Sequence, residues 1–129
     1  MVPKVAFKSG VRVNLLALRP EIMKILEVAV LLAPPLHGNV MVVTSQDDGV
    51  HSQNPRSRHY VGGAWDLRFT GERDGGIVTE ATDPDVIKVE QNLEAIQWAD
   101  RMQRRLEFDR YTVVCEIDHI HAQWGKRPA

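Results

Sequence analysis

The stretch "PEIMKILEVAVLLAPP", residues 20–35, most constrains how this chain can fold. Proline fits the first turn of a helix, where its missing N–H would have no partner, and Glu21 places a negative charge at the positive end of the helix dipole. The apolar residues that follow predict a largely buried helix over residues 20–33, and Pro34-Pro35 end it. A largely buried helix has to pack against a second layer of structure.

Four other segments have the composition or the alternation of strands. Residues 39–45 are rich in β-branched side chains, residues 64–69 alternate, and two further strands are predicted over residues 111–117 and 119–124. The last of these is predicted to lie beside the preceding strand or to continue it. Between the first two strands, residues 46–63 are rich in Gly, Pro, Asn, Asp and Ser, which predicts a long loop.

A second helix is predicted between the two pairs of strands. Asp83 can cap its first turn, and Pro84 fits the position after the cap. Residues near a 3.6-residue period predict its apolar face: Val86, Val89, Leu93, Ile96, Met102 and Leu106. The order of these elements predicts one α+β domain over residues 1–129, with a small antiparallel sheet and flanking helices.

Composition argues against several classes of function. Sixteen Lys and Arg against seventeen Asp and Glu leave a net charge of −1, so nucleic acid is not expected as a partner. The most apolar run, residues 22–36, is interrupted by Lys24 and Glu27 and falls short of the roughly 20 residues that span a bilayer. The first residues lack the apolar segment of a signal peptide, so we expect the chain to be cytoplasmic at synthesis.

The stretch "SRHYVGGAWDLR", residues 57–68, contains a first pair of candidate metal ligands. Catalytic zinc usually has three protein ligands from His, Asp, Glu or Cys and a fourth position open to water. His59 and Asp66 would form such a pair if the loop folds back at Gly62 and Gly63, which tolerate positive φ. A loop histidine is more often a surface residue, so this stretch alone does not predict a site.

A second cluster lies near the end of the chain. His119 and His121 are two residues apart, so on a strand both side chains point to the same face of the sheet. This spacing is a common way for a strand to offer two imidazoles to a metal ion. The other two histidines, His37 and His51, follow no such pattern and are interpreted as structural or loop residues.

Together the two clusters resemble the D-Ala-D-Ala carboxypeptidase and dipeptidase family of zinc peptidases, which includes phage endolysins that cut the L-Ala-D-Glu bond. The Hedgehog signalling domain shares the fold of that family. The family motif Ser-x-His-x-x-Gly-x-Ala-x-Asp is matched by Ser57, His59, Gly62, Ala64 and Asp66. The segment "EIDHIHAQW" resembles the closing Glu/His-x-x-His-x-His segment, and the resemblance covers roughly residues 39–124.

The resemblance implies a Hedgehog/DD-peptidase-like fold and a zinc ion held by His59, Asp66 and one of the last two histidines. Family branches that end in His-x-His use the second histidine, here His121. The branch that ends in Glu-x-x-His uses that histidine, here His119. We favour His121, because the spacing of the closing segment matches the His-x-x-His-x-His branch, with Glu116 in the first position.

Glu116 would then be the general base that accepts a proton from the attacking water. His119 would hydrogen-bond to that water or to the tetrahedral intermediate. On a regular strand Glu116 and His121 face opposite sides, because they are five residues apart, so a bulge or a strand break is required near residues 117–118. Asp118 has the same mismatch and is expected to be a supporting or a surface carboxylate.

The resemblance implies zinc-dependent hydrolysis of peptidoglycan stem-peptide bonds, of the D-Ala-D-Ala carboxypeptidase or L-Ala-D-Glu endopeptidase type. Such a protein would act on the cell wall after release, as a phage or bacterial lysis protein. Family members often hold the substrate carboxylate with an arginine in a Ser-Gly-x-Arg stretch, which here reads "TSQDDG". Arg56, Arg58 or Arg68 could replace it, although each is interpreted first as a solvated loop residue. The missing arginine favours an internal peptide bond over a free dipeptide end.

Two other functions stay open at this point. One is a zinc-binding domain of Hedgehog-like fold that binds without hydrolysis, against which the presence of Glu116 argues. The other is an α+β domain without metal, in which the histidines are core residues. In either case Cys115 is expected to be neither a ligand nor a nucleophile, because on a regular strand it faces away from Glu116.

Overall fold

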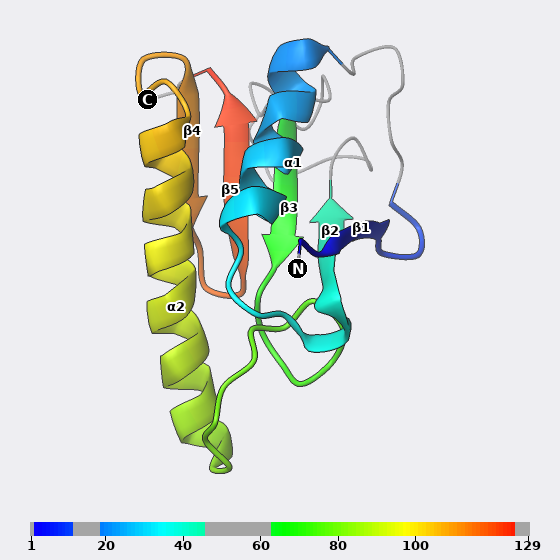
Figure 1. Cartoon of the computed structure of the whole chain (residues 1–129), viewed down its shortest axis with the longest axis vertical. Helices are drawn as coiled ribbons and strands as arrows, with labels where there is room; N and C mark the ends of the chain where they lie inside the picture. Colours follow the sequence, from blue (N-terminus) through cyan, green and yellow to red (C-terminus); the bar gives the residue numbers. More distant parts are fainter. Residues whose placement is uncertain (1, 12–18, 46–62, 126–129) are drawn as a thin grey trace, which may run out of the picture.

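The computed structural model describes residues 2–11, 19–45 and 63–125 (Figure 1). These residues form an α+β structure, as the sequence predicts. The elements in chain order are β1 (Lys4–Phe7), α1 (Pro20–Leu32), the short 3-10 turn η2 (His37–Asn39), β2 (Val40–Ser45), β3 (Ala64–Arg68), α2 (Pro84–Arg105), β4 (Tyr111–Cys115) and β5 (His119–Trp124). The strands form one sheet in the order β1-β2-β3-β5-β4.

The sheet is mixed, so the prediction of a wholly antiparallel sheet is wrong at one edge. Strand β1 pairs with β2 in parallel, with Lys4 opposite Val40 and Phe7 opposite Val43, whereas the other strand pairs are antiparallel. Parallel neighbours need a crossover connection, and here the crossover contains α1. The four residues of β1 are too few to show a strand pattern by themselves, which is why the sequence did not reveal this edge.

Both helices lie on the same face of the sheet, with α1 across β3 and β5 and α2 along β4 (Figure 1). Two buried tryptophans hold this layer together. The indole nitrogen of Trp65 donates to the carbonyl of Ile22 in α1 at 3.1 Å, and that of Trp98 in α2 donates to the carbonyl of Ala29 at 3.1 Å. No helix in the described ranges is long and apolar enough to cross a membrane.

Helix α2 begins as predicted, but it presents a different face to the core. The Oδ1 atom of Asp83 accepts a hydrogen bond from the backbone N–H of Asp85 at 2.8 Å, which confirms the cap. Met102 and Leu106 of the predicted apolar face are buried, which confirms that part of it. The other four residues are exposed, by 45 to 59%: Val86, Val89, Leu93 and Ile96. The buried face instead holds Ile87, Gln91, Ala95, Trp98, Ala99 and Met102. Hydrogen bonds from the side chains of Gln91 and Trp98 favour burial of this face. A prediction from hydrophobic periodicity takes no account of such bonds.

The loop after β3 is held against α2 by the side chain of Gln91, which is 1% exposed. Its Nε2 atom donates to the carbonyls of Gly71 at 2.8 Å and Ile77 at 2.9 Å, and its Oε1 atom accepts from the N–H of Gly71 at 3.1 Å. The backbone of His37 pairs with the same loop, through the carbonyl of Gly76 and the N–H of Gly75. The loop therefore keeps Arg73 in a fixed place beside the end of β3.

Candidate metal-binding site on the polar face of the sheet

The strand register gathers the candidate ligands on the face of the sheet away from the helices, called here the polar face. Strands β3 and β5 are antiparallel, with Asp66 directly opposite His121 and Arg68 directly opposite His119. Residues that are directly opposite in an antiparallel pair share a face. Trp65, one residue away, points to the helices, so these four polar residues point to the other side.

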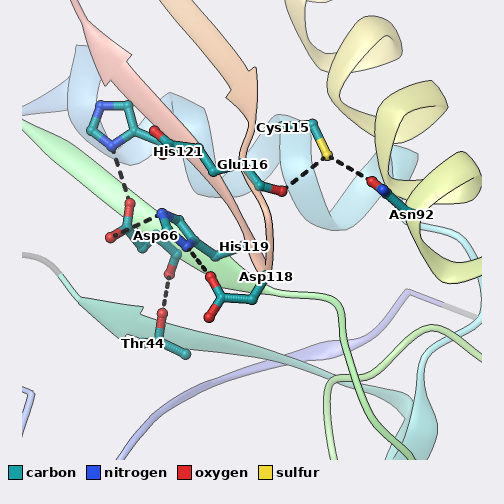
Figure 2. A network of polar contacts seen from close by, with 8 residues as sticks. All are labelled: Thr44, Asp66, Asn92, Cys115, Glu116, Asp118, His119 and His121. Atoms are coloured by element: carbon teal, nitrogen blue, oxygen red, sulfur yellow. Dashed lines mark hydrogen bonds and ion pairs between the residues drawn. The ribbon is translucent and has the colours of Figure 1, made fainter. Parts of the chain in front are cut away.

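Asp66 lies between the two imidazole rings (Figure 2). Its Oδ1 atom is 3.1 Å from Nδ1 of His121, and its Oδ2 atom is 3.7 Å from Nε2 of His119. The side chains of Asp66 and His121 are 13% and 7% exposed, and that of His119 is 27% exposed. The hydroxyl of Thr44 donates to the backbone carbonyl of Asp66 at 3.4 Å, which connects β2 to the same group.

Gln123 sets the orientation of the His121 ring. The Nε2 atom of Gln123 donates to the carbonyl of Gly125 at 3.1 Å, so its Oε1 atom faces His121. That Oε1 atom is 2.7 Å from Nε2 of His121, which must therefore carry the proton of this hydrogen bond. In a neutral imidazole the other nitrogen, Nδ1, then presents a lone pair to Asp66.

The contact between Asp66 and His121 needs either a shared proton or a metal ion. A carboxylate oxygen and a nitrogen lone pair repel each other at 3.1 Å unless a proton or a metal ion lies between them. In a tetrahedral zinc site with bonds of ~2.0–2.1 Å, adjacent ligand atoms are about 3.3 Å apart. The chemistry and the spacing of these two donors fit zinc, and Gln123 supplies the outer hydrogen bond that metal-bound histidines normally have.

A two-residue hairpin turn brings Glu116 to the polar face. The N–H of Glu116 donates to the carbonyl of His119 at 2.8 Å, and the chain reverses at residues 117–118. Val114 is directly opposite His121, and Glu116 is two residues further along, so it alternates to the same face. The break expected near residues 117–118 is confirmed. It is a turn between two strands, which removes the mismatch that a single strand would have.

Asp118 supports His119 from the hairpin turn. Its Oδ1 atom is 2.6 Å from Nδ1 of His119, and its side chain is 69% exposed (Figure 2). A proton on Nδ1 that is shared with Asp118 leaves Nε2 of His119 directed toward Asp66. Asp118 is thus a surface carboxylate that orients a histidine, in keeping with the prediction from alternation.

Cys115 points away from this site. Its sulfur lies 3.9 Å from Oδ1 of Asn92 in α2 and 3.6 Å from the carbonyl of Glu116 (Figure 2). Burial, and then the charge of Glu116, raise the pKa of the Cys115 thiol above its ordinary value. A raised pKa disfavours the thiolate, which is the form that binds metals and attacks electrophiles.

The structure brings together two of the three predicted ligands, Asp66 and His121. The third, His59, lies outside the described residues, and so do Ser57, His51, Arg56 and Arg58. Within the described ranges, no group of three His, Cys, Asp or Glu residues could hold a metal ion. A zinc site here therefore depends on a ligand such as His59. Arg68 lies in β3, as the strand predicted over residues 64–69 implies, and it is partly buried, so its interpretation as a solvated loop residue is wrong.

Gln123 is the residue of this site that sequence reasoning missed. Its position offers a signal, because it is two residues beyond His121 and so lies on the same face as both histidines. A glutamine has no distinctive motif, and only the hydrogen bond to the ring reveals its role.

In comparisons with known proteins, the chain matches no family model, no curated protein and no solved structure.

Proposed function

We propose that this protein is a zinc-dependent peptidase that hydrolyses stem-peptide bonds of peptidoglycan, with His59, Asp66 and His121 as ligands and Glu116 as general base. The observation that carries the proposal is the contact of 3.1 Å between Asp66 and His121, whose other ring nitrogen bonds to Gln123. The two residues come from different motifs, 55 positions apart, and the sheet places them in direct register. The resemblance of both motifs to zinc peptidases supports the same assignment.

His121 is the better choice for the third ligand, and His119 for a catalytic role. The ring of His121 lies 3.1 Å from Asp66 and is nearly buried, whereas that of His119 lies 3.7 Å away and is more exposed. Asp118 engages one nitrogen of His119. The other nitrogen can then hydrogen-bond to the oxygen on which negative charge develops as the peptide bond is attacked.

When bound, zinc supplies the polarisation of the scissile carbonyl and lowers the pKa of a water molecule. The chain supplies the proton transfers. Glu116 accepts a proton from the attacking water as the oxygen–carbon bond forms, and it passes that proton to the leaving amine as the carbon–nitrogen bond breaks. His119 stabilises the developing oxyanion. The hairpin fixes Glu116 and His119 relative to each other, so little reorganisation is needed during the reaction.

The test is digestion of purified peptidoglycan from several wall types, with mass analysis of the fragments and measurement of zinc in the same protein. We expect about one zinc per chain and release of fragments with new peptide ends. A chelator should abolish the cleavage, and added zinc should restore it. Protein without stoichiometric zinc, prepared without chelator, would remove the proposal. Protein with zinc that cleaves none of the walls would instead be a zinc-binding domain without hydrolysis.

A further inference from the structure

A second feature of the polar face is a pocket of about 260 Å³ beside His119. Three cations line it: Lys8, Arg68 and Arg73. They come from different parts of the chain, since Lys8 follows β1, Arg68 ends β3 and Arg73 lies in the loop after β3. Among the described residues that line the pocket, the single carboxylate is Asp118. The pocket therefore carries a net positive charge next to the proposed catalytic groups.

Arg68 forms one wall of this pocket. It sits directly opposite His119, and its Nη1 atom donates to the backbone carbonyl of Asp74 at 3.0 Å. Its Nε atom is buried and has no hydrogen-bond partner among the residues that the structure describes. Arg68 and Arg73 both line this small pocket, and two like charges this close together are stabilised when an anion enters.

Hydrogen bonds from the rest of the fold hold the other walls in place. The backbone N–H of Lys8 donates to the carbonyl of Val43 at 2.8 Å, which extends the pairing of β1 and brings Lys8 beside Thr44. The loop that carries Arg73 is held by the buried Gln91. The hydroxyls of Thr44 and Thr70 also line the pocket. Cations with hydroxyl donors around a small volume suit a carboxylate group.

We propose that this pocket binds a carboxylate of the peptide substrate and so anchors the stem peptide with its scissile bond beside His119. The inference rests on the proposed function and names the substrate group that the function needs. A volume of about 260 Å³ accommodates a carboxylate and the small residue that bears it. The cations of this pocket would replace the carboxylate-binding arginine that the stretch "TSQDDG" lacks. The carboxylate can be that of a terminal D-Ala or the α-carboxylate of an internal D-Glu.

The experiment compares four probes in binding titrations with zinc-loaded Glu116→Gln protein, so that turnover does not interfere. The probes are D-Ala-D-Ala, its C-terminal amide, L-Ala-γ-D-Glu-L-Lys, and the same tripeptide with the α-carboxylate of D-Glu as an amide. We expect one free acid to bind about tenfold or more tightly than its amide. The acid that shows this difference identifies the source of the carboxylate.

Variants then locate the binding at the pocket. Arg73→Gln and Lys8→Gln change exposed residues and should each weaken binding of the preferred acid severalfold, with little effect on its amide. Arg104→Gln is the matched control, because Arg104 is exposed on α2 and pairs with Asp100. Equal binding of acids and amides, or equal affinity in all variants, would overturn the pocket assignment. The proposed function is tested separately, by zinc content and wall cleavage. Failure of the pocket assignment is therefore distinct from failure of the proposed function.

Discussion

The two faces of the sheet differ in chemistry within single strands. On the helix side, Trp65 and Ile120 are both 0% exposed and pack in the hydrophobic core. One residue along each strand, Asp66 and His121 face the opposite side and contact each other. Strand alternation thus separates the residues that hold the fold together from those proposed to act on substrate. Adjacent substitutions should therefore have different consequences, and the predictions below test this separation.

The largest effect is expected for Glu116→Gln on the polar face. Loss of a positioned general base typically costs on the order of 10²–10⁴ in rate. Zinc content and the free energy of unfolding should stay unchanged, because glutamine keeps the size of the side chain. Wall cleavage, zinc content and urea unfolding of the variant measure these quantities, and Glu80→Gln, an exposed change on the loop before α2, is the control. Full activity of Glu116→Gln would make His119 the leading candidate for the base.

On the helix face, Trp65→Ala should lower the free energy of unfolding by about 3–5 kcal/mol, because it leaves a large cavity and removes the hydrogen bond to Ile22. The neighbouring change Asp66→Asn should release zinc and cost little stability in metal-free protein. Urea unfolding in the presence of a chelator compares the two variants. If both lose the same stability without metal, the separation of the two faces does not hold.

Gln123→Ala should lower zinc affinity by about 10–100-fold, because the hydrogen bond that fixes the His121 ring is lost. Gln123→Glu retains an acceptor and should keep most of the affinity. Competition with a coloured chelator measures zinc binding, and nitrogen chemical shifts of His121 report which ring nitrogen is protonated. Gln103→Ala is the control, since Gln103 bonds to the backbone of β4 and not to the site. An unchanged zinc affinity in Gln123→Ala would show that Gln123 does not orient the His121 ring for zinc binding.

The smallest effect is expected for Cys115→Ala, which should keep both zinc and hydrolysis. The raised pKa of Cys115 also predicts a pH dependence of stability. Above the ordinary thiol pKa, the unfolded chain releases the proton first, so the wild-type free energy of unfolding should fall as the pH rises. The variant should lack this part of the decline. Urea unfolding at a series of alkaline pH values measures it, and equal slopes for the two proteins would contradict the assignment.

The sequence predicts best what depends on local pattern. The proline at position 20 predicted the start of α1 correctly. The alternation of residues in β3 and β5 predicted strands there, and these strands pair Asp66 with His121. The face of the first turns of α2 was predicted incorrectly, because Gln91 is buried by hydrogen bonds to the loop after β3. Hydrophobic periodicity cannot weigh such bonds. For the same reason the role of Gln123 was not predicted, because it depends on a hydrogen bond to the ring of His121.

The cationic pocket could not have been predicted from spacing. Lys8, Arg68 and Arg73 follow no motif, and their meeting depends on the parallel pairing of β1 and on the loop held by Gln91. Arg68 alone was a candidate beforehand, and it was interpreted as a solvated loop residue. The structure changes that interpretation because Arg68 is partly buried and its Nε atom has no acceptor within the described part of the chain.

The position of β1 has a consequence for how the protein responds to heating. β1 is an edge strand of four residues, held by one neighbouring strand and by the ring of Phe7, whose centroid lies 6.0 Å from that of Trp65. Such edges open locally at lower free-energy cost than central strands. Opening of β1 would withdraw Lys8 from the pocket while β3 and β5 stay paired. The KM for substrate should therefore rise at temperatures where kcat and bound zinc are still retained.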